Sequence, residues 1–456
     1  MYDVFIDETR EDHKHIPLDQ EIMEELRKLD LKRQNGGGSE DGLPLQDPSD
    51  PIIMWWTEFT REPGITRDCG DNSCFFTNNR KYRDHKNMKV FMFYGTDFSP
   101  DDLPLPRADN HEWALFHEES PKNNYILCHE PVISLFNYTS TFRRESHFPI
   151  STQHLLSLDW LLQSTYTKTV AEKNRYQEEE GLALIVYVQS DCDPPSDRDE
   201  YVKQLMKHIS VDSYGGCLNN RKLPQQIAAP LEGMAHKEFF ELLSRYKFAL
   251  AMENAVCNDY MTEKMWRPLM VGAVPIIFGS SKVKDFLPSN KSALLLQEFK
   301  SPEHLAMVIK NLNENEVEYE KLRKWKTSGI SNTFLFDTMS SRTWAPDDEE
   351  NWIPGHTNFV EGFECYVCNK VHDNMKRQHN GQNIKKQWGK KSHYGCPRPA
   401  KFDEFGRYGK APGWLDFWSS QWEQHGAMAG NLKQCVLQGK TDCKEDTVGS
   451  KAKGDF

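Results

Sequence analysis

The stretch ENAVCNDYMTEKMWRPLMVGAVPIIFG, residues 253–279, places charged and polar side chains directly ahead of an apolar run. Together with the residues before it, its apolar pattern predicts a strand over Phe248–Glu253, a helix over Met261–Val271 and a strand over Val274–Phe278. The polar segment then lies at the carboxyl end of a strand, where doubly wound sheets bind their ligands. This stretch predicts both an α/β fold and the position of its ligand site.

The same turn carries groups that suit a nucleotide. A helix that begins here offers free N–H groups and a positive dipole end to a phosphate. Lys264 can add a point charge, Glu263 can accept hydrogen bonds from ribose hydroxyls, and Tyr260 can pack on a ring. In the alternative interpretation, Asp259 caps the helix, and Glu263 and Lys264 form a solvated first turn.

A second cation is predicted at the same edge of the sheet. Arg198 lies in SDCDPPSDRDEYVKQL, directly after a strand predicted over Ala183–Val188. The alternative is a surface arginine that pairs with a neighbouring carboxylate. Asp191 and Asp193 resemble a metal-binding DxD motif, but acidic residues around turn prolines are usually loop residues. Two cations would also make a metal less necessary for a diphosphate.

Strands and helices alternate through the second half of the chain. Beyond the opening stretch, the pattern predicts a strand at Ala293–Gln297 and helices at Asp197–His208, Pro302–Asn311 and Glu314–Lys326. This alternation is typical of a doubly wound α/β domain. In the first half, continuous apolar strands are predicted at 51–56, 89–95, 113–116 and 132–136, and such strands suit a mostly parallel sheet.

These patterns divide the chain into four parts. Residues 1–50 hold one amphipathic helix, Gln20–Leu31, and a Gly- and Pro-rich tract, and are predicted to be a stem or linker. A Glu-rich helix, Thr167–Glu180, ends at Gly181, so the two α/β domains are placed at 51–180 and 181–345. Residues 346–456 show no clear period and are predicted to be a Cys-containing C-terminal extension.

The composition fits a folded protein with an aromatic-rich interior. Hydrophobic residues make up 38% of the 456 residues and aromatic residues 12%. Because the formal net charge is −12, a general attraction to nucleic acid or to anionic membranes is not expected. Any phosphate must therefore be bound by a few well-aimed cations.

Sequons and cysteines indicate the secretory pathway. Asn137-Tyr138-Thr139 and Asn290-Lys291-Ser292 are candidate N-glycosylation sites, although such sequons also occur in cytosolic proteins, and the chain has 11 Cys. No run of about 18 apolar residues predicts a membrane span, and residues 1–49 lack a signal-peptide pattern. The expectation is a protein of the Golgi or endoplasmic reticulum lumen whose type II anchor is missing from this sequence.

Residues 246–280, YKFALAMENAVCNDYMTEKMWRPLMVGAVPIIFGS, closely resemble the donor-binding motif of the α-1,3-fucosyltransferases of glycosyltransferase family 10. The only notable departure is Met252, where Phe is usual. Further blocks agree: ESPKNN at 119–124, LFNYTSTFRRES at 135–146, VDSYGGC at 211–217 and FECYVC at 363–368. The resemblance implies a GT-B fold, in which two Rossmann-like doubly wound domains face a cleft. The second domain would hold GDP-β-L-fucose and the first the acceptor.

Blocks from both predicted domains are similar to one subgroup of this family. FYGTDF, LPLPR, FHEESPKNN and VQSDCDPPSDRD resemble the α-1,3-fucosyltransferases 10 and 11, which have been assigned as protein O-fucosyltransferases acting on Ser or Thr of EMI domains. The wider family has Y-R-x-D-S-D followed by P-Y-G on the acceptor side, whereas this chain has FRRESHFP at 142–149, with Arg143 and Arg144. This departure puts an N-acetyllactosamine acceptor in doubt.

The resemblance also implies roles for individual residues in an inverting transfer that requires no metal and no cofactor. Lys264 and Arg198 would stabilise the β-phosphate, and Glu263 would bind the ribose. Tyr260 and Tyr214 are expected in the nucleotide pocket, and Asn254, Glu253 and Thr262 complete the expected donor site.

The catalytic base is expected from the first domain. The family's E-S-P block matches Glu119, and Glu118 is the alternative because the spacing before the proline varies. Without the resemblance, two adjacent carboxylates are normally just a solvated loop.

The cysteines allow two interpretations. Cys365 and Cys368, with His372, His379, His393 and Cys396 nearby, could form a zinc site, whereas a secretory compartment favours disulfides. In the family this late C-x-x-C joins two N-terminal cysteines, so the resemblance implies that Cys365 and Cys368 pair with Cys69 and Cys74, in either combination. Among the remaining cysteines, no pairing is assigned to Cys192, Cys217, Cys257, Cys396, Cys435 and Cys443.

The resemblance therefore predicts transfer of L-fucose to a glycoprotein, most simply to Ser or Thr of a folded EMI-type domain. One alternative keeps the enzyme but makes GlcNAc of N-glycans the acceptor, in an α-1,3 linkage. Another is a catalytically weak GT-B protein that binds a secretory partner through the tail after residue 370.

Overall fold

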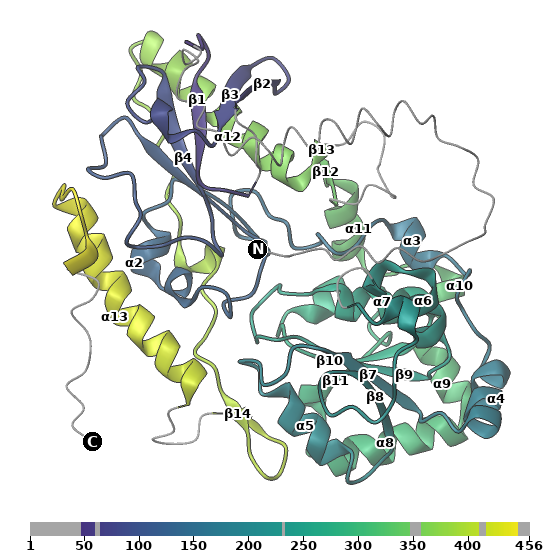
Figure 1. The fold of residues 1–456 in the computed structure, drawn as a ribbon. Coiled ribbons are helices and arrows are strands. Elements are labelled where there is room, and N and C mark those ends of the chain that lie inside the picture. Colours follow the sequence, from purple (N-terminus) through teal and green to yellow (C-terminus); the bar gives the residue numbers. More distant parts are fainter. Residues whose placement is uncertain (1–46, 60–63, 230–232, 347–356, 410–415, 446–456) are drawn as a thin grey trace, which may run out of the picture. The chain divides into compact units, whose positions relative to one another are not determined.

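Two sheets of largely parallel strands form the centre of the fold, one from each half of the chain (Figure 1). The computed structural model describes residues 47–59, 64–229, 233–346, 357–409 and 416–445. Contacts group the chain from Ser49 onward into one unit. The predicted helix Gln20–Leu31 lies outside the described residues.

The first sheet has the strand order β2-β3-β1-β4-β5-β6. Its strands are β1 (Ile52–Thr57), β2 (Ile65–Asp68), β3 (Ser73–Thr77), β4 (Met88–Tyr94), β5 (Glu112–His117) and β6 (Tyr138–Thr141). Only the edge strand β2 runs antiparallel to its neighbour. Counted along the chain, the parallel strands are ordered 2-1-3-4-5, which is a doubly wound order with its switch point between β1 and β4.

The second sheet repeats this order with parallel strands only. Its strands are β7 (Ile185–Gln189), β8 (Val211–Gly215), β9 (Phe248–Met252), β10 (Val274–Phe278) and β11 (Leu294–Leu295), arranged β11-β10-β9-β7-β8. The switch point lies between β7 and β9. The predicted fold class, two doubly wound α/β domains, is confirmed.

Helices cover both faces of the second sheet (Figure 1). Alternating side chains of its strands pack against different helices. Val186 and Ala249 share a core with α6 (Lys237–Ser244) and α7 (Glu263–Val271). Ile185 and Phe248 share another core with α5 (Arg198–Leu205) and α8 (Pro302–Glu314). The one-residue alternation follows from the two-residue period of a strand that is buried on both faces.

The first sheet is covered by helices from the end of the chain. Ile53 and Trp55 of β1 pack with α12 (Phe359–His379), whereas Ile52 and Met54 of the same strand pack with α13 (Phe417–Leu437). The predicted C-terminal extension thus supplies the cover for both faces of a sheet formed some 300 residues earlier.

The remaining described helices and strands are short. They are α2 (Glu130–Ile133), α3 (Leu158–Leu162), α4 (Val170–Glu180), α9 (Glu316–Arg323), α10 (Trp325–Ser328), α11 (Thr333–Ser340), β12 (Trp344–Ala345), β13 (Thr357–Asn358), β14 (Lys401–Phe402) and β15 (Tyr408–Gly409). Both α3 and α4 pack on the second sheet, because Leu161 and Val170 belong to its two cores.

Some predicted elements differ from the structure. The apolar run at 132–136 was predicted as a strand, but it forms the end of α2 and a loop, with Pro131 in the first turn of the helix. A five-residue run that is largely apolar does not by itself distinguish a strand from a helix. The single helix predicted over Glu314–Lys326 is divided into α9 and α10.

None of the described helices combines the length and the apolar character that a membrane span requires.

Candidate functional site

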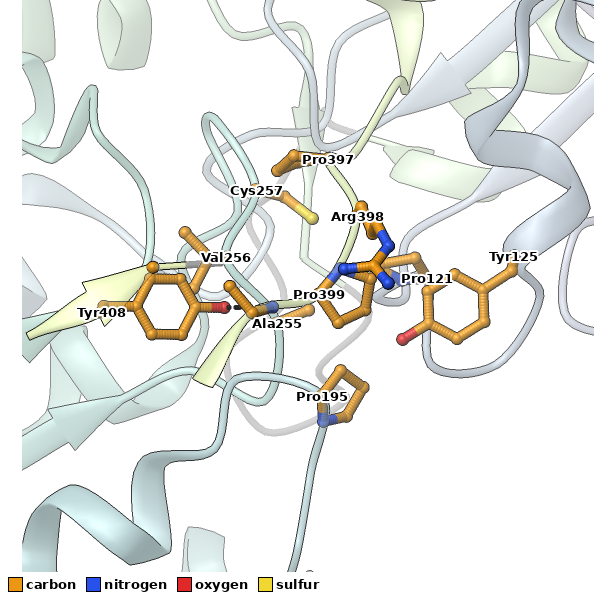
Figure 2. Close-up of a pocket in the computed structure, with 12 residues that line it drawn as sticks. Pro121, Tyr125, Pro195, Ala255, Val256, Cys257, Pro397, Arg398, Pro399 and Tyr408 are labelled. Carbon is orange, nitrogen blue, oxygen red and sulfur yellow. Dashed lines mark hydrogen bonds between the residues drawn. The ribbon is translucent and has the colours of Figure 1, made fainter. Parts of the chain in front are cut away.

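A cavity of about 460 Å³ lies at the carboxyl ends of the second sheet. Its volume falls within the range of about 300–1,000 Å³ that is typical of ligand pockets. The turns after β7 and β9 contribute Ser190 and Asn254, and Gly215 is the last residue of β8. The first half of the chain contributes Glu119 and His154. A smaller pocket of about 200 Å³ is built on three of the same chain segments (Figure 2).

The turn between β9 and α7 is built around the carboxylate of Glu253. This buried group accepts hydrogen bonds from the backbone N–H of Thr262 (2.7 Å) and from its hydroxyl (2.8 Å). Thr262 caps α7, because its side chain accepts from the Lys264 N–H. The interpretation in which Asp259 caps this helix is therefore wrong. Glu253, expected to contact the donor, is not among the cavity-lining residues and instead positions the start of the helix.

The ammonium group of Lys264 lies between two carboxylates in the cavity wall. Its Nζ is 2.9 Å from Glu263 Oε1 and 4.0 Å from Glu253 Oε2. Burial alone would lower the pKa of Lys264, but these carboxylates raise it above its ordinary value. Burial would likewise raise the pKa of Glu263, yet Lys264, His154 and Arg267 hold it well below its usual range. At neutral pH the wall therefore presents a cation beside a charged hydrogen-bond acceptor.

Arg198 bridges the switch point of the second sheet. The side chain is fully buried, and its Nη1 and Nη2 donate hydrogen bonds of 2.8 Å to the carbonyls of Met252 and Asp191. These two bonds fix the guanidinium between the ends of β7 and β9. Its Nε has no hydrogen-bond partner among the described residues, and the side chain lines the cavity. A fixed cation with an unpaired N–H fits an anionic oxygen.

The remaining lining fits a nucleotide sugar. Asn254 lines the cavity, and its buried Oδ1 lacks a hydrogen-bond partner among the described residues, so it can accept from a ligand hydroxyl. Val188, Ile227 and Phe239 form an apolar part of the wall that suits a flat base. The cavity therefore combines cations, a hydrogen-bond acceptor that has no partner among the described residues, and an apolar surface.

The two adjacent carboxylates of the first half face different surroundings. Glu119 lines the cavity, and its pKa is raised by burial, with Lys264 opposing the shift. Glu118 is not among the lining residues, and its Oε1 accepts a 2.9 Å hydrogen bond from the Tyr94 hydroxyl. Burial raises the pKa of Glu118 to about 7. Of the two predicted bases, the geometry favours Glu119.

The two predicted nucleotide-pocket tyrosines also differ. Tyr260 lines the cavity and packs on Phe142 of the first half, with ring centroids 4.9 Å apart. Tyr214 is not among the lining residues, and its hydroxyl is 2.8 Å from that of Tyr246. The expected role of Tyr214 in the pocket is therefore not supported, because the side chain belongs to the core beneath the sheet.

Two titratable lining residues, Arg267 and His154, are not predicted from the sequence. Arg267 lies one helical turn after Glu263 and lines the same cavity. The i, i+4 spacing in the sequence would have indicated this, because it places both side chains on the same face of the helix. His154 Nδ1 lies 3.9 Å from Glu263 Oε2, and desolvation lowers the pKa of the imidazole. No sequence pattern indicated His154, because it reaches the cavity from the other half of the chain.

Arg143 and Arg144, expected on the acceptor side, belong to an ionic cluster around Asp259. The buried Asp259 carboxylate accepts from Arg144 Nη2 at 2.7 Å, and Asp285 accepts from Arg144 Nη1 at 2.8 Å. Arg143 Nη1 donates to the Tyr394 carbonyl at 3.1 Å, and Arg143 Nε lies 3.8 Å from Asp259. These contacts join the two halves of the chain and engage both guanidinium groups.

The Asp191-Cys192-Asp193 triplet does not present a set of free metal ligands. Asp191 forms an ion pair with Lys122, and Cys192 forms a disulfide with Cys217. The Asp191 contact is a further tie between the two halves.

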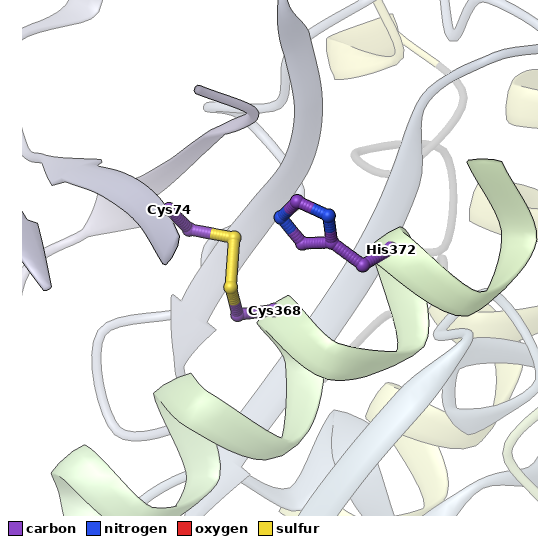
Figure 3. Close-up of side chains that lie close together, drawn as sticks. All are labelled: Cys74, Cys368 and His372. Carbon is purple, nitrogen blue, oxygen red and sulfur yellow. A yellow bond between two sulfur atoms is a disulfide. The ribbon is translucent and has the colours of Figure 1, made fainter. Parts of the chain in front are cut away.

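Disulfides clamp the first sheet to the end of the chain. Cys69 pairs with Cys365 and Cys74 with Cys368, which joins β2 and β3 to α12. Figure 3 shows the ring of His372 beside the Cys74–Cys368 bond, and its Nε2 lies 2.8 Å from the Ser73 carbonyl oxygen. The zinc interpretation of Cys365-x-x-Cys368 is wrong for this structure, because both sulfurs are in disulfides and Cys396 is bonded to Cys257.

The two sequons lie in different environments. Asn290 is exposed, as an acceptor of an N-glycan must be. Asn137 is 1% exposed, and its Nδ2 donates to the Gln387 carbonyl at 3.0 Å. The expectation of a glycan on Asn137 is therefore corrected, because the folded chain encloses the nitrogen to which the sugar would be attached.

Comparison with known proteins gives matches to both halves. Residues 48–152 match the family described as "Fucosyltransferase, N-terminal", and residues 179–388 match "Glycosyltransferase family 10 (fucosyltransferase) C-term". GDP-fucose protein O-fucosyltransferase 3 of Gallus gallus is 47% identical over 388 residues, which cover 85% of this chain and 80% of the relative. The Homo sapiens protein of the same name is 49% identical over 353 residues, covering 77% and 72%.

Solved structures are more distant. An α1,3-fucosyltransferase with GDP-fucose is 15% identical, with a TM-score of 0.37 and coverage of 72% of this chain and 93% of that one. An α1,3-fucosyltransferase with GDP is 15% identical, with a TM-score of 0.40 and coverage of 78% and 97%. At such low TM-scores, the fold assignment rests on the strand orders described above.

Proposed function

This chain belongs to glycosyltransferase family 10, the fucosyltransferases, and we propose that it moves L-fucose from GDP-β-L-fucose to a Ser or Thr hydroxyl of a protein. The observation that carries this proposal is the cavity in which Glu119, Lys264 and Arg198 converge from different chain segments. The names of the relatives support GDP-fucose as the donor and a protein as the acceptor.

The transfer is a single displacement with inversion. Glu119 takes the proton from the acceptor hydroxyl while that oxygen forms a bond to the anomeric carbon of fucose. The bond between that carbon and the β-phosphate oxygen breaks, and GDP leaves with the electron pair. The β-linked donor thereby gives an α-linked product.

The cations of the wall stabilise the leaving diphosphate. Lys264 and Arg198 supply positive charge near the β-phosphate, and Glu263 accepts from the ribose hydroxyls. Asn254 accepts from a hydroxyl of the donor sugar, and Tyr260 and Thr262 shape the pocket around it. Because these cations can neutralise the leaving charge, the proposed reaction requires neither a metal nor a cofactor.

A folded EMI-type domain is the proposed acceptor, and the lumen of the endoplasmic reticulum or Golgi is the proposed location. The resemblance to the subgroup that modifies EMI domains supports the first proposal. Five disulfides and the exposed sequon at Asn290 support the second, since such bonds persist in oxidising compartments.

A product analysis separates this proposal from its alternatives. The chain is incubated with GDP-fucose and either a folded EMI-type domain or an N-glycan that ends in GlcNAc, and the products are identified by mass spectrometry. The proposal expects fucose on a Ser or Thr of the domain. Fucose found only on the glycan would favour the alternative in which the enzyme α-1,3-fucosylates GlcNAc of N-glycans. Absence of transfer to either acceptor would favour the catalytically weak protein that binds a secretory partner.

A further inference from the structure

We infer that the smaller pocket (Figure 2) holds an apolar side chain of the acceptor polypeptide, next to the hydroxyl that receives fucose. The inference rests on the proposed transfer to a protein hydroxyl. It adds the subsite through which the enzyme would recognise a polypeptide rather than a glycan.

The pocket adjoins the donor cavity along three chain segments. Glu119 lines the cavity and Pro121, two residues on, lines the pocket. Asn254 lines the cavity and Ala255 lines the pocket. Along the chain, Pro195, which lines the pocket, lies between Asp191 and Arg198, which line the cavity. The pocket therefore borders the end of the cavity that carries the proposed base, where an acceptor must enter.

The size and chemistry of the pocket suit one apolar side chain. Its volume of about 200 Å³ is smaller than the roughly 300–1,000 Å³ of pockets that enclose a whole small ligand. Four of its lining residues are prolines, Pro121, Pro195, Pro397 and Pro399, which offer no backbone N–H donors. A sugar in this pocket would leave most of its hydroxyls without partners, whereas an aliphatic or aromatic side chain needs none.

One polar group in the wall supports a polypeptide ligand. Tyr125 is 3% exposed, and its hydroxyl has no hydrogen-bond partner among the described residues. Figure 2 shows this hydroxyl directed across the pocket toward Pro195 and Pro399. A buried, unpaired O–H favours a ligand that brings one acceptor, and the backbone carbonyl of a peptide is such a group.

The far wall is held in place by covalent and ionic contacts. Cys257 of the β9–α7 turn is bonded to Cys396, directly before Pro397. Arg398 Nε donates to Glu423 of α13 at 2.8 Å, and the N–H of Ala400 donates to the Tyr408 hydroxyl at 3.2 Å. Pro397 and Gly409 are exposed, so the pocket has an open rim. The pocket is thus fixed in shape and accessible.

Two substitutions test the inference. Gly409→Leu adds a side chain at the rim, and an added Cβ there meets no atom within 4 Å, so the change introduces no clash at that atom. Tyr125→Phe removes only the unpaired hydroxyl. Gly430→Leu on α13 is the matched control, because an added Cβ there also meets nothing within 4 Å and Gly430 does not line the pocket.

The readouts are the KM for a folded EMI-type acceptor, kcat, and the dissociation constant of GDP measured by calorimetry. We expect Gly409→Leu to raise the acceptor KM at least tenfold and Tyr125→Phe to raise it about two- to tenfold, as for the loss of one hydrogen bond. The dissociation constant of GDP stays within twofold in both variants. Gly430→Leu leaves all three quantities unchanged.

A second measurement identifies the occupant. Apolar residues that flank the fucosylated hydroxyl of the acceptor are replaced by alanine one at a time, and the replacement that raises KM with wild-type enzyme should have little effect with Gly409→Leu. An unchanged acceptor KM in both pocket variants would overturn the subsite while the proposed function stands. Failure of wild-type enzyme to modify any protein hydroxyl would instead overturn the proposed function.

Discussion

The carboxylate of Glu253 and the backbone N–H of Thr262 are joined by a 2.7 Å hydrogen bond in the interior of the protein. Through Thr262, this bond fixes the first turn of α7 and so the position of Lys264.

Glu253→Ala should therefore weaken donor binding although Glu253 does not line the cavity. The change leaves the Thr262 N–H unpaired, at a cost of about 1–3 kcal/mol in folding free energy. Displacement of Lys264 raises the dissociation constant of GDP about tenfold, as measured by calorimetry. Glu253→Gln is the control, since it keeps an oxygen for the Thr262 N–H and should have a smaller effect on both quantities. Equal GDP affinity in wild type and Glu253→Ala would contradict this positioning role.

Arg144→Ala should lower stability without changing donor binding. The substitution leaves the buried Asp259 carboxylate with Arg143 at 3.8 Å as its nearest cation, while the backbone N–H of residue 144 still donates to it at 3.1 Å. A destabilisation of about 3 kcal/mol, the lower end of the range for breaking a buried ion pair, is therefore expected in thermal or denaturant unfolding. Asp285→Asn removes the other, half-exposed carboxylate that pairs with Arg144. This change should lower the free energy of unfolding by at most about 1 kcal/mol. If the two variants unfold at the same temperature, Asp259 is not the centre of this cluster.

The disulfide pattern predicts a single free thiol. The chain has 11 Cys, ten of which form five disulfides, while Cys128 is free and buried. Alkylation of the unfolded, unreduced protein should therefore modify one cysteine, and Cys128→Ser should give none. Additional modification of Cys69, Cys74, Cys365 and Cys368 would support the zinc interpretation instead.

Of the two sequons, only the one at Asn290 is expected to carry a glycan. In protein made in a secretory host, Asn290→Gln should remove the mass that an N-glycosidase releases, because Asn290 is exposed. Asn137→Gln should leave that mass unchanged but lower stability, since Asn137 Oδ1 accepts from the Trp113 N–H at 3.0 Å. A glycopeptide that contains Asn137 would contradict the enclosure of this side chain.

The second half of the fold follows closely from local sequence pattern. Its strands are continuous apolar runs separated by helices, so the parallel sheet and the turn at Glu253–Thr262 are readable from residues that lie near each other in the chain. Asn254 lies in that turn, and Glu263 and Lys264 begin the helix that follows it, so all three line the cavity.

The first half depends on contacts that no local pattern contains. Residues of α12 and α13 complete the cores of β1, and His154 reaches Glu263 from more than 100 residues away. The sequence also does not distinguish a cation that faces a ligand from one that joins two segments, as the contacts of Arg144 illustrate. Its partners Asp259 and Asp285 come from the other half of the chain.

The raised pKa of Glu119 predicts the acidic limb of the pH profile. A general base acts when deprotonated, so activity is lost as the pH falls through its pKa. Because burial raises that pKa, kcat/KM should fall on the acidic side with a midpoint above pH 4.5, the ordinary pKa of Glu. The profile of kcat/KM for the acceptor is measured over pH 4–9 with the acceptor below its KM and GDP-fucose saturating. A limb at or below the ordinary value would exclude Glu119 as this group.

The most direct test of the account compares donor binding and transfer in Glu119→Gln. The amide keeps the shape of the side chain but cannot take the proton, so we expect the dissociation constant of GDP to stay within about threefold of wild type while kcat falls by about 10²–10⁴. Glu118→Gln serves as the matched control and should retain most of the activity. Wild-type turnover by Glu119→Gln would contradict the central claim that this carboxylate, facing Lys264 across one cavity, is the catalytic base.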